Sequence, residues 1–333
     1  MSYVATVEPG RDCSQVGARP AEGRGLMDFL VGKAPHNAAE FPASAADVFD
    51  LDNLRVTFDR NQRILWWSMR PRRRPSFTAE LLADMKMVAD ALEALFATPA
   101  GGAGAGGDQP AVNHLVLSSL MPGIFNLGGD LSLFLDLIEQ RDRTGLIRYA
   151  HYCADGQHRI ASNFGLPIST VALIQGDALG GGFEAALAND VIIAERSAKF
   201  GLPEVLFNLF PGMGAYSFLA RRIGAVEAER MILSGRIYSA EELGAMGVVD
   251  GVVDDGAGPA AVYDHVVAFE RIGRARQAVL QARRIVNPVS RDELIRIADV
   301  WVETALMLSS RDLRRMRHLA MAQDRRWAAL QPR

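Results

Sequence analysis

Two glutamates in glycine-rich surroundings are the side chains of this sequence best suited to acid–base chemistry. Glu184 closes the segment 180–184, GGGFE, and Glu204 stands 20 residues later in the segment 200–204, FGLPE. A carboxylate among apolar and small residues is expensive to bury unless it has a partner or a chemical role. Two carboxylates facing one site can share a water or a substrate hydroxyl, one ionised and one protonated. The structural alternative places Glu184 at a helix N-terminus and Glu204 on a surface loop.

Two glycine turns accompany these glutamates. The segments 123–131, GIFNLGGDL, and 176–184, GDALGGGFE, each follow an apolar strand and open a helix. The first N–H groups of such a helix point outward without partners, so two converging turns would form an oxyanion hole for a thioester carbonyl. Gly180, Gly182 and Ala185 also match the G-x-G-x-x-A spacing of a dinucleotide-binding loop, but that interpretation leaves the Gly128-Gly129 turn unexplained. Tight turns without a ligand are the third alternative.

The elements that must position these residues alternate between strands and helices. A β-hairpin is predicted over 54–68 around the 60–62 turn, and Ser76 can cap a helix that extends to Phe96. Further strands are predicted over 112–117, 169–174 and 191–194, with helices starting near Asp130, within 145–163 and after the triple glycine. Because parallel neighbouring strands need a crossover, this order predicts an α/β fold with parallel strands.

Composition and charge limit the class of protein. The chain has 333 residues, 49% of them hydrophobic, and its 36 basic and 39 acidic side chains give a formal charge of −3. A disordered chain and a whole-protein nucleic-acid binder are therefore excluded. The only cysteines, Cys13 and Cys153, cannot build a disulfide scaffold. With no secretory signal and no apolar run long enough to span a membrane, the sequence predicts a cytoplasmic protein without membrane contact.

Composition and hydrophobic pattern divide the chain into three predicted parts. These are a poorly ordered leader at 1–50, a catalytic core at 51–255 and a helical region at 256–333. A glycine- and alanine-rich insertion occupies 99–107. From Arg271 onward there are 14 arginines against 6 acidic residues, so the last part is locally basic.

Three linked motifs together resemble the crotonase (enoyl-CoA hydratase/isomerase) superfamily. They are the turn at 123–131, the segment 178–184, ALGGGFE, and the segment 200–204 followed by 211–214, PGMG. The resemblance implies a crotonase-like ββα superhelix with a helical C-terminal region that makes trimer contacts, and trimers that pair as hexamers. It further implies an oxyanion hole from the N–H groups of Gly129 and Gly181, with Gly128 and Gly180 as neighbours. Glu184 and Glu204 match the acid–base glutamates of the hydratases.

A narrower resemblance concerns the segments 151–160, HYCADGQHRI, 174–178, IQGDA, and 207–211, FNLFP, together with the arginine-rich C-terminal region. These are similar to the diffusible-signal-factor synthases. That resemblance implies dehydration of 3-hydroxyacyl chains on acyl carrier protein to a cis-2-enoyl product, and thioester hydrolysis to release a fatty acid quorum-sensing signal. It also admits a signalling kinase as a regulatory partner. For this dehydration we assign removal of the C2 proton to Glu204 and protonation of the departing C3 hydroxyl to Glu184.

Other candidate residues have a structural alternative beside each functional one. His151, Cys153 and His158 lack a fourth metal ligand, and we expect neither a metal nor a cofactor. Arg72, Arg73 and Arg74 could dock a carrier protein or form a solvated loop. Trp301, Met307 and Leu319 could line an acyl pocket, although packing is the preferred interpretation for each of them.

The leading functional hypothesis is the carrier-protein-dependent dehydratase and thioesterase. An ordinary enoyl-CoA hydratase that acts on CoA thioesters is the alternative enzyme. A non-catalytic regulatory protein on a crotonase scaffold is the alternative of a different class, and the presence of both Glu184 and Glu204 argues against it.

Overall fold

Parallel strands connected by helices form the centre of the molecule. The computed structural model describes residues 45–97 and 112–330. Within them, the larger sheet contains, in spatial order, β1 (Ala45–Asp50), β2 (Leu54–Asp59), β3 (Ile64–Met69), β4 (His114–Ser119), β6 (Ser169–Ile174), β8 (Val191–Glu195) and β11 (Gly251–Val253). The smaller sheet contains β10 (Ile237–Ser239), β9 (Lys199–Gly201), β7 (Gly176–Leu179) and β5 (Gly123–Asn126). From β3 to β11 the larger sheet is parallel, as the alternation of strands and helices predicts.

Helices connect the strands and form the last part of the described chain. They are α2 (Ala79–Phe96), α4 (Leu131–Glu139), α5 (Arg143–Ala161), α6 (Gly181–Leu187), α7 (Ala215–Ile223), α8 (Ala225–Ser234), α9 (Ala240–Ala245), α10 (Gly258–Glu270), α11 (Gly273–Val286), α12 (Arg291–Leu306) and α13 (Ser310–Leu330). Short 3-10 helices occupy Asn163–Gly165 and Pro203–Phe207. No described helix is long and apolar enough to cross a membrane.

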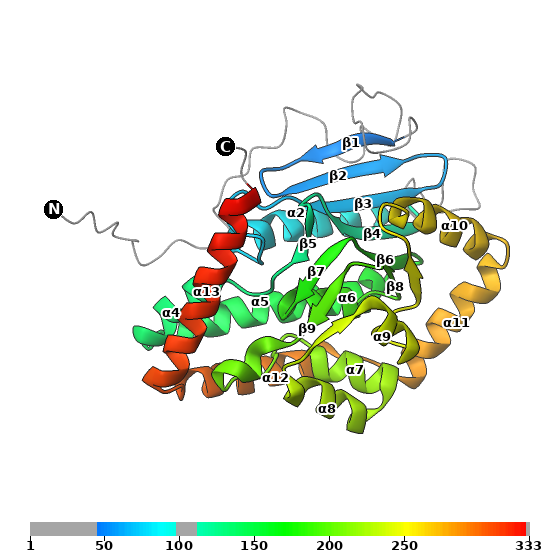
Figure 1. The fold of residues 1–333 in the computed structure, drawn as a ribbon. Helices are drawn as coiled ribbons and strands as arrows, with labels where there is room; N and C mark the ends of the chain where they lie inside the picture. Colours follow the sequence, from blue (N-terminus) through cyan, green and yellow to red (C-terminus); the bar gives the residue numbers. More distant parts are fainter. Residues whose placement is uncertain (1–44, 98–111, 331–333) are drawn as a thin grey trace.

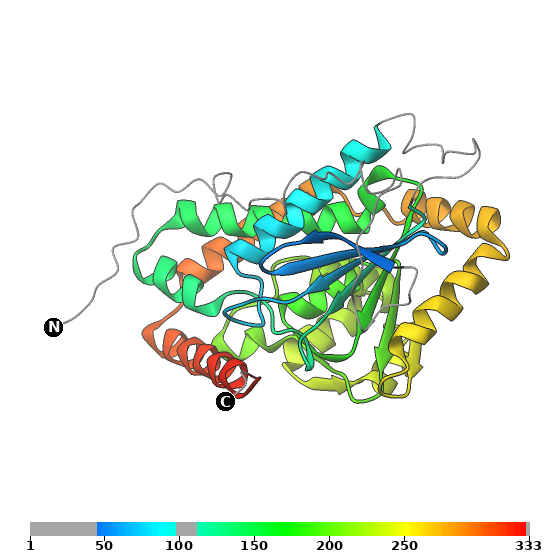
Figure 2. The ribbon, with the colours of Figure 1, turned by 90° about the horizontal axis from the view of Figure 1, so that it is seen from above.

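The larger sheet has helices on both faces (Figures 1 and 2). One face carries the main hydrophobic core, to which Trp67 of β3, Leu81 of α2 and Leu146 of α5 belong. On the opposite face, Val262 and Val266 of α10 pack against the sheet. Strands that are apolar on both faces are typical of a parallel sheet covered on both sides, and β3 and β6 are buried along their whole length.

The predicted hairpin is confirmed, but the predicted helix cap is not. β2 pairs antiparallel with β3, with Leu54 opposite Met69. Helix α2 is capped by Thr78, whose hydroxyl accepts from the N–H of Leu81, and not by Ser76. The chain enters the helix later than predicted because the Phe77 N–H donates to the Gly128 carbonyl at 2.8 Å, which keeps Phe77 extended.

The first and last parts of the chain meet the core differently. Strand β1 lies at the end of the predicted leader and pairs with β2, so ordered structure begins before the predicted boundary at residue 51. The insertion at 99–107 lies outside the described residues. At the other end, α12 packs along α5, and α13 crosses the ends of β5 and β7 (Figure 1). Helix α13 thereby reaches the two glycine turns.

Candidate active site

Glu184 is held by the backbone of a loop that follows in the sequence. It lies in the first turn of α6, is 1% exposed, and its Oε1 accepts from the N–H of Met213 at 2.8 Å and of Ala215 at 3.0 Å. Hydrogen bonds of this kind favour the ionised carboxylate. Burial has the larger effect, however, and raises the pKa of Glu184 to about 7.

Glu204 reaches the same place from the 3-10 helix Pro203–Phe207. Its Oε2 is buried and has no hydrogen-bond partner among the described residues. Its Oε1 lies against Gly180, where a Cβ would be only 2.5 Å away. Burial and the nearby charge of Glu184 raise the pKa of Glu204 to about 8. Gly180 is therefore a glycine because a side chain there would displace the Glu204 carboxylate.

The two carboxylates form one titrating pair with unequal surroundings. Two close, buried carboxylates cannot both be ionised without a large penalty, so the pair retains a proton near neutral pH. The two backbone donors favour the charge on Glu184, whereas Glu204 has only the hydrogen bond of its own backbone N–H and an unpartnered Oε2. The arrangement therefore suits a base at Glu184 and an acid at Glu204.

The two glycine turns converge beside this pair. A Cβ built on Gly181 would lie 3.5 Å from both the Cα of Gly128 and the N of Gly129. The N–H groups of Leu127 and Gly128 donate to the Pro75 carbonyl and to Asn126 Oδ1. Gly181 is the first residue of α6, so its N–H precedes the first hydrogen bond of the helix, and the Gly129 N–H comes directly after that of Gly128. The arrangement suits a two-donor oxyanion hole.

An aromatic cluster supports the first turn and the loop that holds Glu184. The Phe134 ring packs edge-on against Tyr149 and Trp301, with centroids 4.9 and 5.0 Å away. A Cβ at Gly129 would lie 2.6 Å from the Phe134 ring, and one at Gly212 would lie 2.4 Å from Trp301. Trp301 is thus a packing residue that contacts the 211–214 loop.

A cleft of about 290 Å³ opens over the two glycine turns. Gly129, Gly180 and Glu204 line its floor, and Leu319 and Gln323 of α13 line its wall. This places Leu319 at the site. The other apolar candidate, Met307, is 76% exposed at the end of α12, so it neither lines a described cavity nor packs in the core. Met307 is the C-cap residue of α12, and its role in an acyl pocket stays a prediction.

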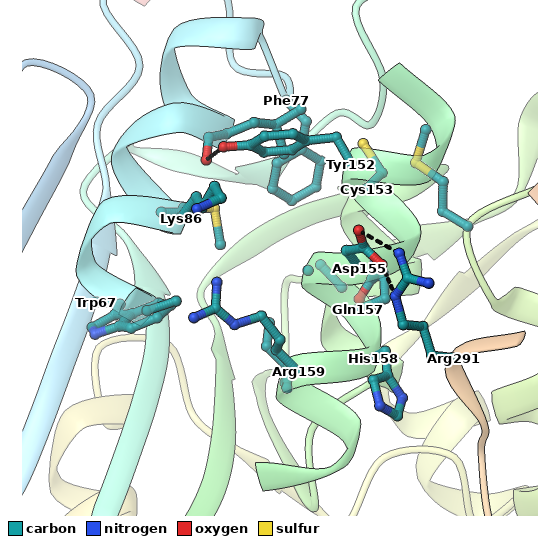
Figure 3. A pocket seen from close by; sticks show the side chains of 17 residues that line it. Trp67, Phe77, Lys86, Tyr152, Cys153, Asp155, Gln157, His158, Arg159 and Arg291 are labelled. Atoms are coloured by element: carbon teal, nitrogen blue, oxygen red, sulfur yellow. Dashed lines mark hydrogen bonds and ion pairs between the residues drawn. The ribbon is translucent and has the colours of Figure 1, made fainter. Parts of the chain in front are cut away.

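A second, apolar cavity of about 260 Å³ lies between α2 and α5, on the Glu184 side (Figure 3). Its wall includes Trp67, Met85 and Cys153, and it reaches Ala185 and Met213, the neighbours of Glu184 and of its loop. Burial raises the pKa of the Cys153 thiol, so the group is a neutral part of the wall.

The cations at the rim of this apolar cavity are each paired with a carboxylate. Lys86 binds Asp90 at 2.6 Å, and Arg159 binds Asp90 and Glu93 at 2.8 and 2.9 Å. Arg291 binds Asp155 at 2.6 Å, the pair drawn with dashed lines in Figure 3. The rim therefore offers no unpaired positive charge to a ligand.

The arginines considered for carrier docking differ from one another. Arg72 and Arg73 are exposed, and Arg72 binds Asp52. Arg74 instead bridges Asp130 at 3.0 Å and Asp324 at 2.6 Å. Both carboxylates hold Arg74 at the oxyanion turn, so it is not free to dock a partner.

The three residues that were considered and set aside as metal ligands have other contacts. His151 binds Asp299 at 2.6 Å, and Cys153 and His158 line the apolar cavity. Across the two described stretches, 45–97 and 112–330, no three His, Cys, Asp or Glu side chains are grouped to hold a metal ion.

Several residues that hold the site carry little sequence signal. Met213 and Ala215 act through backbone N–H groups, for which any residue type would serve, and only the glycines around them mark the loop. Asn126 had a usable signal, since asparagine before a glycine turn commonly bonds the backbone two residues on. Gln323 had none.

Comparisons with known proteins identify the family. Residues 104–307 match the family described as Enoyl-CoA hydratase/isomerase. The mitochondrial methylglutaconyl-CoA hydratase of Rattus norvegicus is 32% identical over 160 residues, which cover 48% of this chain and 49% of the relative. The chain spans about half the length of the curated relatives it matches.

Solved structures of the same kind share the fold over most of the chain. An enoyl-CoA hydratase from Bacillus halodurans superposes with a TM-score of 0.64 at 22% identity, covering 80% of this chain and 99% of that one. Human mitochondrial delta3-delta2-enoyl-CoA isomerase superposes with a TM-score of 0.65 at 19% identity, covering 82% and 99%. The α/β crotonase-like fold predicted from the sequence is confirmed. With a family match over more than half of its residues, this chain belongs to the enoyl-CoA hydratase/isomerase family.

Proposed function

We propose that the protein is a hydratase that adds water reversibly across the C2–C3 double bond of 2-enoyl-CoA thioesters. One observation carries this proposal: the buried carboxylate of Glu184 and the partly buried carboxylate of Glu204, whose Oε2 has no partner, lie beside the two converging backbone turns at Gly129 and Gly181. A base, an acid and a pair of donors for a charged oxygen are the groups that this reaction needs.

In the hydration direction, Glu184 removes a proton from the water that attacks C3. The electrons move toward the thioester, whose oxygen gains negative charge and is stabilised by the N–H groups of Gly129 and Gly181. Glu204 then gives its proton to C2. Dehydration runs through the same steps in reverse, with Glu204 taking the C2 proton and Glu184 protonating the departing hydroxyl. The charge distribution favoured by the Met213 and Ala215 donors is the one from which hydration starts.

The substrate's thioester lies in the cleft under α13, and its acyl chain extends past Glu184 into the apolar cavity between α2 and α5. An apolar cavity of roughly 150 Å³ holds benzene, so at the same volume per carbon the 260 Å³ cavity takes about ten carbons. Because the rim cations are already paired, a plain hydrocarbon chain fits this cavity better than a carboxylated chain such as that of methylglutaconyl-CoA.

The test is a chain-length profile of hydration with 2-enoyl-CoA substrates from four to fourteen carbons, compared with methylglutaconyl-CoA. Ala89 lines the apolar cavity and is 4% exposed, whereas Ala94 of the same helix is exposed. Ala89→Phe should shift the preference to shorter chains, and Ala94→Phe should leave it unchanged. An unchanged profile in Ala89→Phe, or a preference for methylglutaconyl-CoA, would place the acyl chain elsewhere.

We also propose, as the second candidate, dehydration of 3-hydroxyacyl chains on acyl carrier protein, followed by thioester hydrolysis to a free cis-2-unsaturated signal acid. The volume of the apolar cavity favours it, and so do the exposed Arg72 and Arg73 beside Arg74, which binds Asp130 next to Gly129. Mass spectrometry of free acids released from 3-hydroxyacyl carrier proteins distinguishes the two candidates. Release of a cis-2-enoic acid supports the second candidate, and a hydrated CoA thioester without free acid supports the first.

We further propose that the chain assembles into trimers through its helical C-terminal region. Apolar side chains are unusually exposed there and on neighbouring α8, including Leu233 at 64% and Val300 at 57%. These two residues border a groove between α8 and α12. Light scattering coupled to gel filtration checks the assembly, and Leu233→Arg together with Val300→Arg should yield monomers.

A further inference from the structure

Helix α13 contacts the oxyanion turn directly, although almost two hundred residues separate them in the chain. Gln323 Nε2 donates to the carbonyl of Leu127 at 2.9 Å, across 196 positions of sequence. Leu127 stands two residues before Gly129, the proposed first oxyanion donor. We propose that Gln323 is a positioning residue that aims the Gly129 N–H at the thioester oxygen. This inference rests on the proposed function.

The remaining polar groups of the turn are held from other sides. The Gly128 carbonyl accepts from Phe77, and the Asp130 N–H lies 3.5 Å from the Tyr149 hydroxyl, which itself donates to the Phe77 carbonyl. Asp130 caps α4 through the N–H groups of Ser132 and Leu133. Of the partners that fix the turn, Gln323 is the one supplied by α13 through a side-chain amide.

Loss of the Gln323 contact frees the Leu127 carbonyl. The Leu127–Gly128 peptide is then held only by the bond from the Gly128 N–H to Asn126 Oδ1, and it can tilt about that bond. The tilt passes through Gly128, whose positive φ of 96° sets the direction of the next N–H. A donor that is displaced by about 1 Å can cost up to about 10²-fold in rate. The rate should fall in the step in which the thioester oxygen becomes charged. A misdirected Gly129 N–H weakens binding of the neutral carbonyl only slightly.

Three ion pairs keep α13 in the position from which Gln323 reaches the turn. Asp324 binds Arg74, which also holds Asp130 at the end of the turn. Arg326 binds Asp177 at the start of the second turn, and its other nitrogen donates to the Gly123 carbonyl at 3.2 Å. Through these contacts one helix, α13, holds both glycine turns.

Arg317 of α13 forms the third pair, with Glu139 of α4. It lies about two helical turns before Gln323. Together with Asp324 and Arg326, it fixes the helix on both sides of the amide.

The test compares Gln323→Met with Arg325→Met in the full chain. Methionine keeps the length and volume of glutamine but cannot donate a hydrogen bond, and Arg325 lies exposed on the same helix. With crotonyl-CoA, Gln323→Met should lower kcat about 10- to 100-fold while KM stays within about twofold. Arg325→Met should match the wild type. An unchanged kcat, or a rise in KM alone, would overturn the inference.

Two dead-end ligands separate positioning from a general loss of shape. Acetoacetyl-CoA places negative charge on its thioester oxygen when it enolises, and S-butyl-CoA has no such oxygen. Gln323→Met should weaken acetoacetyl-CoA binding by the same order as kcat and leave S-butyl-CoA binding unchanged. Equal losses for both ligands would show that Gln323 acts only as part of the cleft wall and would refute the positioning role. This binding arm needs no turnover, so it separates a failure of the inference from a failure of the proposed hydration.

Variants of the supporting ion pair give a rescue control. Asp324→Asn keeps an acceptor for the Arg74 Nε, whereas Asp324→Leu removes it. Asp324→Leu should show the kinetic pattern of Gln323→Met, and Asp324→Asn should recover most of kcat. The same loss in both variants would show that α13 acts through charge alone and not through placement of the amide.

Discussion

Replacing Glu204 by glutamine should stabilise the protein while it stops the reaction. Glutamine keeps the shape of the side chain but removes a charge that is buried and unpartnered at Oε2. The folded protein retains the Glu204 proton up to a pH of about 8, which is its raised pKa, whereas the unfolded chain releases it near 4.5. Between these values the folded state binds more protons, so the free energy of unfolding decreases as the pH rises.

The size of this effect follows from the pKa shift. Each pKa unit corresponds to about 1.4 kcal/mol, so a shift from 4.5 to about 8 sets an upper limit of roughly 5 kcal/mol. Glu184 shares part of this penalty because the two carboxylates titrate together. We therefore expect Glu204→Gln to exceed the wild type by about 2 to 3 kcal/mol at pH 8.5, with the difference disappearing near pH 4.5.

Urea unfolding at several pH values between 4.5 and 8.5 measures this difference, and hydration of 2-enoyl-CoA is assayed on the same samples. Glu229, exposed on α8, provides the control variant Glu229→Gln, which should follow the wild type at every pH. If Glu204→Gln is less stable than the wild type at pH 8.5, or if its advantage does not grow with pH, then Glu204 is not a buried carboxyl of raised pKa.

Three further substitutions probe other parts of the site. Gly181→Ala should fold, because its Cβ makes ordinary 3.5 Å contacts. The added methyl group would fill the space beside the Gly181 N–H and lower kcat by about 10²-fold or more. A fully active variant would place the oxyanion hole elsewhere. Glu184→Leu should destabilise the fold by about 2 to 6 kcal/mol in thermal or urea unfolding, since two buried N–H groups lose their acceptor. Glu184→Gln keeps an acceptor oxygen for them. Equal stabilities of the two variants would contradict the hydrogen bonds. Arg72→Glu with Arg73→Glu should raise KM for an acyl-carrier-protein substrate at low salt but not for a CoA thioester, and equal effects on both would remove these arginines from carrier docking.

The sequence was sufficient to predict the elements that carry strong local signals. The hairpin of β2 and β3, the turns at Gly129 and Gly181 and the helix capped by Asp130 all appear where spacing and residue type place them. Each has a signal within a few residues, such as a glycine pair, an N-cap residue or alternating apolar residues, even where distant partners complete the structure.

Features that depend on distant partners could not be predicted in the same way. Glu184 is held by backbone N–H groups 29 and 31 residues away, and backbone donors leave no mark on residue type. The cap moved from Ser76 to Thr78 because a carbonyl of the distant Gly128 captures Phe77, and both candidate caps are chemically suitable. The contact of Gln323 with the oxyanion turn depends on where α13 crosses the fold.

The most direct test of the central claim is the turnover of 2-enoyl-CoA by the wild type, Glu184→Gln and Glu204→Gln in deuterated water. The wild type should form 3-hydroxyacyl-CoA with one solvent deuterium at C2, and each variant should lose at least about 10²-fold in rate, as expected when an acid–base group is removed. A wild type that forms no hydrated product, or either variant with turnover near that of the wild type, would contradict catalysis by the glutamate pair.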